Sequence, residues 1–180
     1  MASKFFSTGS PFDATPLQGA FETLLAMDFR KGEFAIAGSA ALHFLSSTAI
    51  SRGFEGLMTR MPHDLDILIV GEARERAREL GIITPSHLGK GYLISLQLGE
   101  NKADLLDITT AWPVGPQPEN AKELAAMTHH VEGFRVMEEQ WVLELKHQFN
   151  RAKDRPDIEQ ATKSMFKGHF RPANIQISPK

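Results

Sequence analysis

The segment from Asp64 to Val70 constrains the fold most, because it is apolar apart from aspartates at alternate positions. A run of branched apolar residues of this length predicts a β-strand. Alternate side chains of a strand point to the same face, about 7 Å apart along the chain. Asp64 and Asp66 are therefore expected to project together from one face of a strand.

The other elements predict a mixture of helices and strands. Composition and apolar spacing predict helices at residues 16–29, 40–45, 72–80, 120–127, 138–152 and 156–167. Short apolar runs predict strands at residues 34–37, 64–70, 92–98, 102–108 and 131–136. The residues between 46 and 59 are polar and include glycine, so we expect a loop or a broken helix there.

These elements together indicate an α+β fold, in which helices cover a small mixed β-sheet. The strands at 92–98 and 102–108 flank a turn that contains Gly99, so they predict an antiparallel hairpin. We expect the strands of Asp64 and Asp104 to be adjacent, and the C-terminal helices to close a cleft beside them.

The chain has 180 residues, which is enough for one well-buried core. We expect a core at residues 16–136 and a helical part packed on it at residues 137–170. Residues 1–15 and 171–180 are rich in residues that break regular structure, so we expect a flexible arm and a flexible tail.

Composition narrows the classes of function. A net charge of −2 argues against a protein that coats duplex nucleic acid through a basic surface. No apolar run approaches the length of about 18 residues that a membrane span needs, and the N-terminus lacks the apolar segment of a signal peptide. The chain has no cysteine, which excludes disulfides and thiol chemistry. We expect a soluble, cytoplasmic protein without a membrane partner.

Asp64 and Asp66 are candidate metal ligands. Two carboxylates on one face repel each other and raise each other's pKa unless a cation neutralises them. Mg²⁺ takes oxygen ligands and often shares its coordination shell with substrate phosphates, so the pair is suited to this ion. The structural alternative is that Asp64 caps the strand while Asp66 pairs with a nearby arginine or lysine.

Asp104 is the candidate third carboxylate, since it lies in a second apolar run where an unpaired buried carboxylate would be costly. Three converging carboxylates could hold two cations about 4 Å apart, which suits phosphoryl or nucleotidyl transfer. Asp107 is the competing choice. In a regular strand it points to the face opposite Asp104, and its structural role would be a cap before Thr109.

Gly38 and Ser39 are candidate phosphate-binding residues. They form the predicted turn between a strand and a helix, and free backbone N–H groups at the start of a helix attract anions. The Ser39 hydroxyl can add a donor. An ordinary helix cap would give the same sequence pattern, so the acidic residues are needed to favour the phosphate site.

The combination of Gly38-Ser39, Asp64-x-Asp66 and a later strand with Asp104 resembles the nucleotidyltransferase superfamily with the polymerase-β-like fold. The similarity is closest to bacterial abortive-infection toxins and minimal nucleotidyltransferases, and it covers roughly residues 34 to 160. In those relatives an arginine commonly precedes the first aspartate by four positions, as Arg60 does here. Their late helix carries a lysine and an arginine followed by Lys-Asp and another aspartate, and the run from Glu144 to Ile158 resembles that block.

The resemblance implies roles for individual residues. Asp64 and Asp66 would bind both metal ions, Mg²⁺ or Mn²⁺, and Asp104 would complete the second site and help to deprotonate a hydroxyl. Ser39 would hold a triphosphate oxygen. Lys146 would offset phosphate charge, although a lysine on a helix surface is often simply solvated. Arg60 would reach a phosphate or a nucleobase, or else pair with Asp64 or remain on the surface.

The implied activity is transfer of a nucleoside monophosphate from a nucleoside triphosphate, such as ATP, to a hydroxyl on a small molecule, a protein or an RNA. The nearest relatives imply a toxin–antitoxin or phage-defence setting. An alternative is a catalytically weak module of the same fold that acts by binding a protein partner of the toxin–antitoxin type. A further alternative is a phosphoesterase that uses the same metal chemistry with water as the nucleophile.

Overall fold

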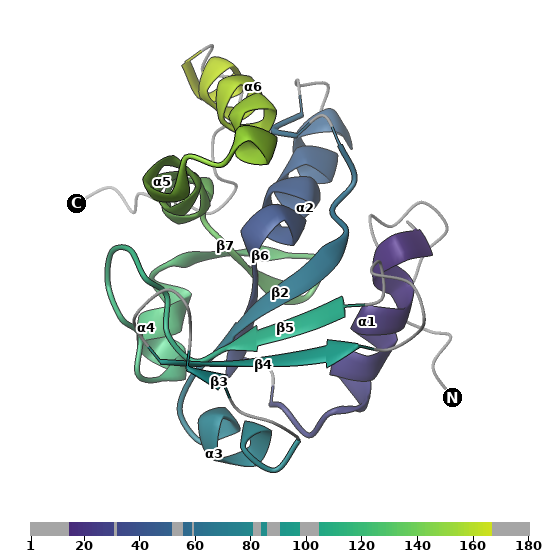
Figure 1. The fold of residues 1–180 in the computed structure, drawn as a ribbon, viewed down its shortest axis with the longest axis vertical. Coiled ribbons are helices and arrows are strands. Elements are labelled where there is room, and N and C mark those ends of the chain that lie inside the picture. The colour runs from purple at the N-terminus through teal and green to yellow at the C-terminus, as the bar shows by residue number, and fades with distance from the viewer. Residues whose placement is uncertain are drawn as a thin grey trace, which may run out of the picture.

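The computed structural model describes residues 15–30, 32–51, 56–58, 60–80, 84–85, 91–97 and 105–166. These residues form a mixed α/β fold with six α-helices and one sheet of seven strands, shown in Figure 1. The helices are α1 (Thr15–Ala26), α2 (Gly38–Ser51), α3 (Ala73–Ala77), α4 (Ala121–Ala125), α5 (Glu139–Phe149) and α6 (Arg155–Phe166), with a short 3₁₀ helix, η3 (Ala152–Asp154), between the last two. The strands are β1 (Phe34–Ala37), β2 (Asp64–Ile69), β3 (Thr84–Pro85), β4 (Tyr92–Gln97), β5 (Leu105–Thr109), β6 (Thr128–Val131) and β7 (Phe134–Met137).

The sheet has the strand order β3-β4-β5-β2-β1-β7-β6. Strand β2 pairs in parallel with β5 and antiparallel with β1, and β4 pairs antiparallel with β5 as the hairpin prediction requires. The turn of that hairpin lies outside the described residues. The Asp64 strand thus occupies the centre of the sheet, where both of its edges are hydrogen-bonded.

The sheet is larger than the small one predicted from the sequence. The segment 131–136 was expected to be one strand, but it is the middle of a hairpin in which β6 and β7 are antiparallel. The chain reverses at Glu132 and Gly133, which both have positive φ, 48° and 87°. A glutamate in this conformation is uncommon, and β6 is polar, so neither the turn nor the strand β6 has a clear signal in the sequence.

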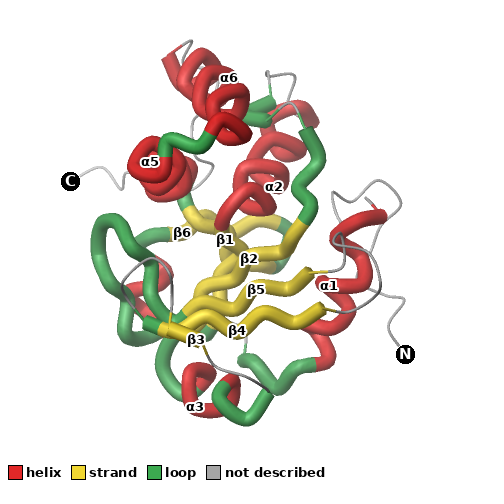
Figure 2. Tube along the Cα trace, viewed as in Figure 1, coloured by secondary structure: helices red, strands yellow, loops and turns green. Residues whose placement is uncertain are grey.

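Helices α1 and α2 supply much of the core that packs on the sheet. Leu17, Phe21 and Leu24 of α1 are buried at helical spacing, and the Phe21 ring packs edge to face on Phe134 of β7 at 5.0 Å between centroids. Helices α2, α5 and α6 gather beside the sheet in the upper half of Figure 2, whereas α3 lies at the opposite side. The pocket described below opens between α5 and the sheet.

Several helix boundaries differ from the predictions, most of all the end of α2. Helix α2 continues to Ser51, so the first six residues of the expected loop at 46–59 are helical. The Ser46 side chain is buried in that helix and accepts a hydrogen bond from the Met58 amide, which anchors the chain beyond it. Helix α1 ends at Ala26, before the end that was predicted at residue 29.

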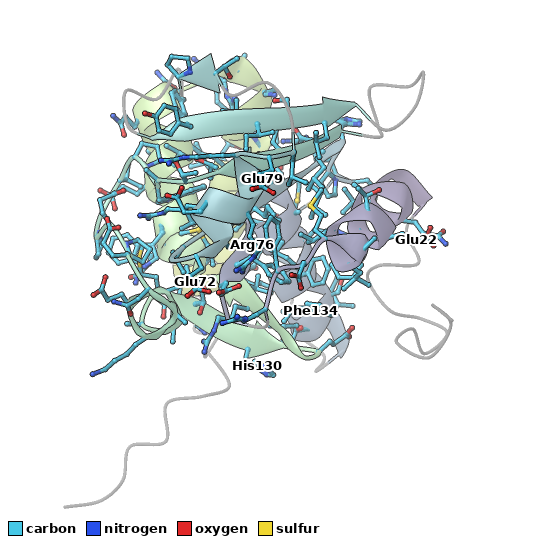
Figure 3. All side chains as sticks on the ribbon, turned by 90° about the horizontal axis from the view of Figure 1, so that it is seen from below. Glu22, Glu72, Arg76, Glu79, His130 and Phe134 are labelled. Atoms are coloured by element: carbon cyan, nitrogen blue, oxygen red, sulfur yellow. The ribbon has the colours of Figure 1, made fainter. Side chains whose placement is uncertain are left out.

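Ion pairs attach α3 to the rest of the fold. Arg76 pairs with Glu33 ahead of β1 and, at 3.5 Å, with Glu72. Figure 3 labels Arg76 and Glu72 near each other. Ala73 and Ala77 turn inward and are fully buried, so this helix is less exposed than its charged sequence suggested. Within the described part of the chain, no helix has the length and apolar character that a membrane span requires.

Candidate active site

Three aspartates from two neighbouring strands form an acidic group. The parallel register sets Asp66 of β2 directly beside Asp107 of β5, and Asp64 lies two positions earlier on the same face as Asp66. One carboxylate oxygen from each of the three lies within 4.8 Å of the others, and all three side chains are half-buried. Such a group of oxygen donors could hold a metal ion.

The third carboxylate of this group is Asp107, the residue that the sequence did not favour. Asp104 lies outside the described residues. Asp104 was preferred because an unpaired carboxylate in an apolar run would be costly, but that argument does not say which residue of the later strand lies beside Asp66. The register of a parallel pair is set by long-range packing. Ser95 of β4 also donates a hydrogen bond to the Asp107 carboxylate, which fixes its orientation.

The three carboxylates lie close together, so their negative charges repel one another. Burial, with the charges of Asp64 and Asp107, raises the pKa of Asp66 to about 7, although Lys146 and Arg151 pull it in the other direction. The metal-free pocket is therefore protonated at Asp66 for part of the time near neutral pH. A cation at the group would remove the repulsion that raises this pKa.

Gly38 allows the acidic group to lie against the start of α2. Its φ is 57°, in the left-handed region. A Cβ at this position would collide with the Asp66 side chain, since it would lie 2.7 Å from Cγ and closer still to Oδ2. The end of β1 and the carboxylate of β2 can thus be neighbours only because residue 38 has no side chain.

We expect Gly38→Ala to lower the affinity for a divalent cation more than tenfold, because the new methyl group displaces the Asp66 carboxylate. Loss of one contact between a charged group and the cation lowers the affinity by about one order of magnitude. Backbone strain should cost a further 1–2 kcal/mol, roughly, of folding stability. Gly133→Ala is the matched control, since φ there is also positive but a Cβ would meet nothing within 4 Å. Mn²⁺ binding followed by electron paramagnetic resonance measures the effect. Equal affinities of the two variants would contradict the prediction.

Lys146 lies at the centre of a buried polar network, which we call the Lys146 network and which comprises Ser39, Arg60, Lys146, Asp154 and Asp157. The Lys146 ammonium donates to Ser39 Oγ at 3.0 Å, to Asp154 Oδ1 at 2.9 Å and to Asp157 Oδ2 at 3.2 Å. Lys146 is 4% exposed, and both carboxylates are fully buried. Lys146 is therefore a buried, ion-paired residue and not the solvated lysine on a helix surface that was the alternative in the sequence analysis.

Arg60 belongs to the same network. Its guanidinium binds Asp157 Oδ2 through Nε at 3.2 Å and Nη2 at 2.8 Å, and Nη2 also approaches Ser39 Oγ at 3.4 Å. Of the alternatives considered for Arg60, the ion pair with Asp64 is not formed, and Arg60 pairs instead with Asp157 of α6. Arg60 also lines the pocket, which keeps it within reach of a bound anion.

Asp154 is held in its charged form. Burial raises the pKa of its carboxyl group, but hydrogen bonds from Arg151 and Lys146, together with their charges, outweigh burial and hold the pKa below its ordinary value. Because the native pKa is lowered, the carboxylate stabilises the fold at pH values above its ordinary pKa of about 4. This stabilisation is lost as the pH falls through the native pKa.

Asp154→Asn should accordingly lower the free energy of unfolding by about 1–3 kcal/mol at pH 7, the usual worth of hydrogen bonds to a charged group. The difference from the unaltered chain should shrink as the pH is lowered below about 4, because the carboxylate of the unfolded chain is protonated first and the native carboxylate follows at its lower pKa. Urea unfolding at pH 7, 5 and 3.5 measures both quantities. A difference that stays constant over this range would show that the charge of Asp154 is unimportant.

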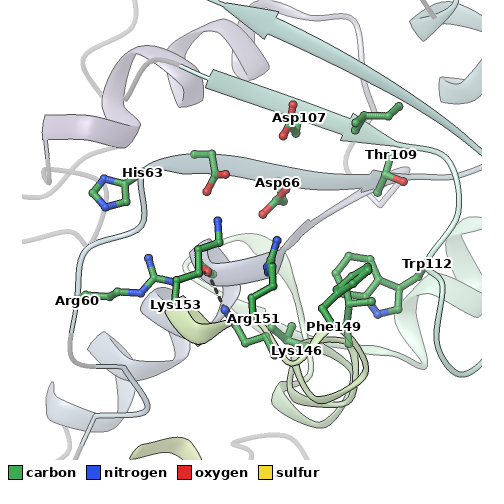
Figure 4. Close-up of a pocket in the computed structure, with 16 residues that line it drawn as sticks. Arg60, His63, Asp66, Asp107, Thr109, Trp112, Lys146, Phe149, Arg151 and Lys153 are labelled. Carbon is green, nitrogen blue, oxygen red and sulfur yellow. Dashed lines mark hydrogen bonds between the residues drawn. The ribbon is translucent and has the colours of Figure 1, made fainter. Parts of the chain in front are cut away.

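The acidic group and the Lys146 network face a common pocket of about 200 Å³. Figure 4 shows Asp66 and Asp107 on one wall, with Arg151 and Lys153 reaching toward them from the other. The polar lining residues include Gly38, Ser39, Arg60, His63, Asp64, Asp66, Asp107, Lys146, Arg151 and Lys153. The structure thus brings the described candidate residues of the sequence analysis into one place.

Several lining residues were missed by the sequence-based selection. Arg151 and Lys153 lie in the segment between Glu144 and Ile158 that resembled a family block, and this was the available signal for them. Leu93, Trp112, Val142, Leu145 and Phe149 form the apolar part of the lining. Apolar pocket residues look like core residues in a sequence, and Trp112 is indeed 3% exposed and anchored by a hydrogen bond to the Trp141 carbonyl at 3.3 Å.

No model of a known protein family matches the chain, and no curated protein or solved structure is significantly similar to it.

Proposed function

We propose that this chain is a Mg²⁺-dependent nucleotidyltransferase, which moves a nucleoside monophosphate from a nucleoside triphosphate to a hydroxyl acceptor. The observation that carries the proposal is that three carboxylates face cationic side chains across one pocket, beside the Gly38-Ser39 turn. Carboxylates alone would suit many cations, and cationic side chains alone would suit many anions. Their combination suits a phosphate chain that binds together with its metal ion.

The donor set is compatible with Mg²⁺ or Mn²⁺. All three donors are carboxylate oxygens, which hard divalent cations prefer, and their mutual repulsion leaves a charge for a cation to neutralise. Asp64, Asp66 and Asp107 would hold the ion. When bound, it would withdraw charge from phosphate oxygens and so favour attack at phosphorus.

The proposed transfer forms a bond between the acceptor oxygen and the α-phosphorus. The bond between the α-phosphorus and the bridging oxygen breaks, and pyrophosphate leaves. The acceptor hydroxyl loses its proton, and a carboxylate of the acidic group would accept it. Cationic side chains on the opposite wall would offset the charge of the triphosphate and hold it in line for attack.

The apolar part of the pocket suits the nucleoside. Phe149 and Leu145 of α5 are partly buried and line the same pocket as the charged residues. The Arg151 guanidinium lies 5.4 Å from the centre of the Phe149 ring, which holds this ring at the edge of the charged region. A nucleobase could pack on these side chains while its triphosphate extends toward the acidic group.

The decisive experiment is incubation of the purified chain with each of the four nucleoside triphosphates, labelled at the α-phosphate, together with Mg²⁺ and a cell extract. We expect label on one class of macromolecule or metabolite, and none with Asp66→Asn. Asp28→Asn is the matched control, because Asp28 is exposed and outside the pocket, and it should leave labelling intact.

Other outcomes would favour other functions. Labelled monophosphate released without an acceptor would indicate a phosphoesterase, which uses the same metal chemistry with water. Absence of nucleotide binding, combined with a protein that copurifies with the chain, would indicate the module that acts by binding a partner. Labelling that survives Asp66→Asn would place the reaction elsewhere and overturn the proposal.

A further inference from the structure

The Lys146 ammonium has no hydrogen left for a ligand. An ammonium group has three N–H donors and no acceptor. All three are used within the protein, by Ser39 Oγ, Asp154 Oδ1 and Asp157 Oδ2, at 2.9 to 3.2 Å. The side chain is also 4% exposed, so a phosphate oxygen would have to replace one of these partners.

The Ser39 hydroxyl accepts hydrogen bonds from both Lys146 and Arg60. A serine hydroxyl can accept two hydrogen bonds and donate one. Both acceptor positions are used, by Lys146 Nζ at 3.0 Å and by Arg60 Nη2 at 3.4 Å. The hydroxyl hydrogen must therefore point away from the two cations, and it is available to a ligand because Ser39 lines the pocket.

Two other cations of the pocket remain available to a ligand. Lys153 is exposed and lines the pocket. Arg151 binds Asp154 through Nε, and its side chain is 48% exposed, so its terminal nitrogens can reach a further acceptor. Both reach into the space in front of the acidic group in Figure 4.

We propose that Lys146 is a positioning residue: together with Arg60 it fixes Ser39 as a hydrogen-bond donor toward the phosphate chain, which Arg151 and Lys153 contact directly. The inference deepens the proposed function and rests on it. It replaces the direct phosphate contact that the resemblance implies for Lys146. Asp154 and Asp157 then serve to hold the ammonium in place.

A double-mutant cycle tests the assignment. Removal of Lys146 alone would leave buried carboxylates unpaired, so Lys146→Met is made together with Asp154→Asn and compared with Asp154→Asn alone. The comparison is made once with Ser39 present and once in a Ser39→Ala background. The affinity for each of the four nucleoside triphosphates is measured by calorimetry, with Ca²⁺ in place of Mg²⁺ to suppress turnover, and the tightest-binding one is used as the probe.

If Lys146 acts through Ser39, its loss should lower affinity about tenfold with Ser39 present and less than about twofold in the Ser39→Ala background. Lys153→Ala should lower affinity about tenfold in both backgrounds, as expected for a charged contact made directly. Lys122→Ala, at an exposed lysine of α4, is the control for loss of one positive charge and should change nothing. Equal losses on removal of Lys146 in both backgrounds would show direct contact and overturn the proposal.

A structure of the unaltered chain with the same nucleotide provides a test that does not depend on the folding of a variant. Lys146 Nζ should keep its three protein acceptors, with no phosphate oxygen within about 3.2 Å. A phosphate oxygen inside that distance would overturn the proposal. An unaltered chain that binds none of the four nucleotides would instead overturn the proposed function itself, and this inference with it.

Discussion

Asp66→Asn is expected to lower the proposed nucleotidyl transfer by about 10³-fold, or about 4 kcal/mol of transition-state stabilisation, while making the metal-free protein more stable. Activity falls because the central oxygen donor of the acidic group is lost. Stability rises because the substitution removes a carboxylate that burial and two like charges disfavour. A residue whose removal damages function but improves stability is characteristic of a site under functional constraint.

The gain in stability should depend on pH in a defined direction. The native pKa of Asp66 is raised to about 7, whereas an unfolded aspartate titrates near 4. Ionisation of Asp66 therefore lowers the free energy of unfolding. This loss of stability is absent at low pH, increases as the pH rises between these two pKa values, and is complete above about pH 8. Asp66→Asn should raise the free energy of unfolding by about 1–2 kcal/mol at pH 8 and by almost nothing at pH 4. The gain at pH 8 is smaller than the full pKa shift would give, because the half-buried side chain is partly screened by solvent.

Urea unfolding in the presence of a chelator at pH 4 and pH 8 measures this effect, with exposed Asp28→Asn as the control. Addition of Mg²⁺ at pH 8 should stabilise the unaltered chain but not the Asp66→Asn variant, because a ligand stabilises only the state that binds it. A variant that is less stable than the unaltered chain at pH 8 without metal would contradict this account of the acidic group.

Lys146→Met should be among the most destabilising single substitutions in this chain. It removes the ammonium that pairs with two fully buried carboxylates, Asp154 and Asp157. Removal of one partner from a buried ion pair costs about 3–5 kcal/mol, because the remaining charge stays without compensation. The double variant Lys146→Met with Asp154→Asn should recover part of this loss, since Asp157 keeps its ion pair with Arg60.

Chemical denaturation at pH 7 measures these differences. Lys122→Met is the control, because this lysine of α4 is exposed. Its substitution should change the free energy of unfolding by no more than about 0.5 kcal/mol. A loss of less than 1 kcal/mol for Lys146→Met, roughly the worth of a surface ion pair, would show that the network contributes little to folding.

The elements around the acidic strand could be predicted because their signals are local. Strand β1 has the bounds predicted from Phe34 to Ala37, and the helix that follows it begins at the predicted Gly38-Ser39 turn. The alternation of Asp64 and Asp66 follows from strand geometry alone, and both side chains belong to the acidic group. Short-range sequence patterns were sufficient for this half of the candidate site.

The other half depends on features that no local pattern specifies. The choice of Asp107 follows from the register between β2 and β5, which long-range packing sets. The partners of Lys146 depend on the sharp end of α5 at Asn150, whose φ of 46° lies in the left-handed region. Asparagine tolerates this conformation but does not require it, so the return of Asp154 and Asp157 toward Lys146 could not be predicted.

The ion pair of Arg60 with Asp157 joins residues that are 97 positions apart in the chain. A contact of such separation carries a higher loop-closure cost than a local contact, and we expect it to form after the local elements have docked. The three carboxylates, in contrast, come from neighbouring strands. During folding, the negative wall of the pocket can therefore assemble before the positive wall, and the two walls face each other only when the last helices close over the sheet.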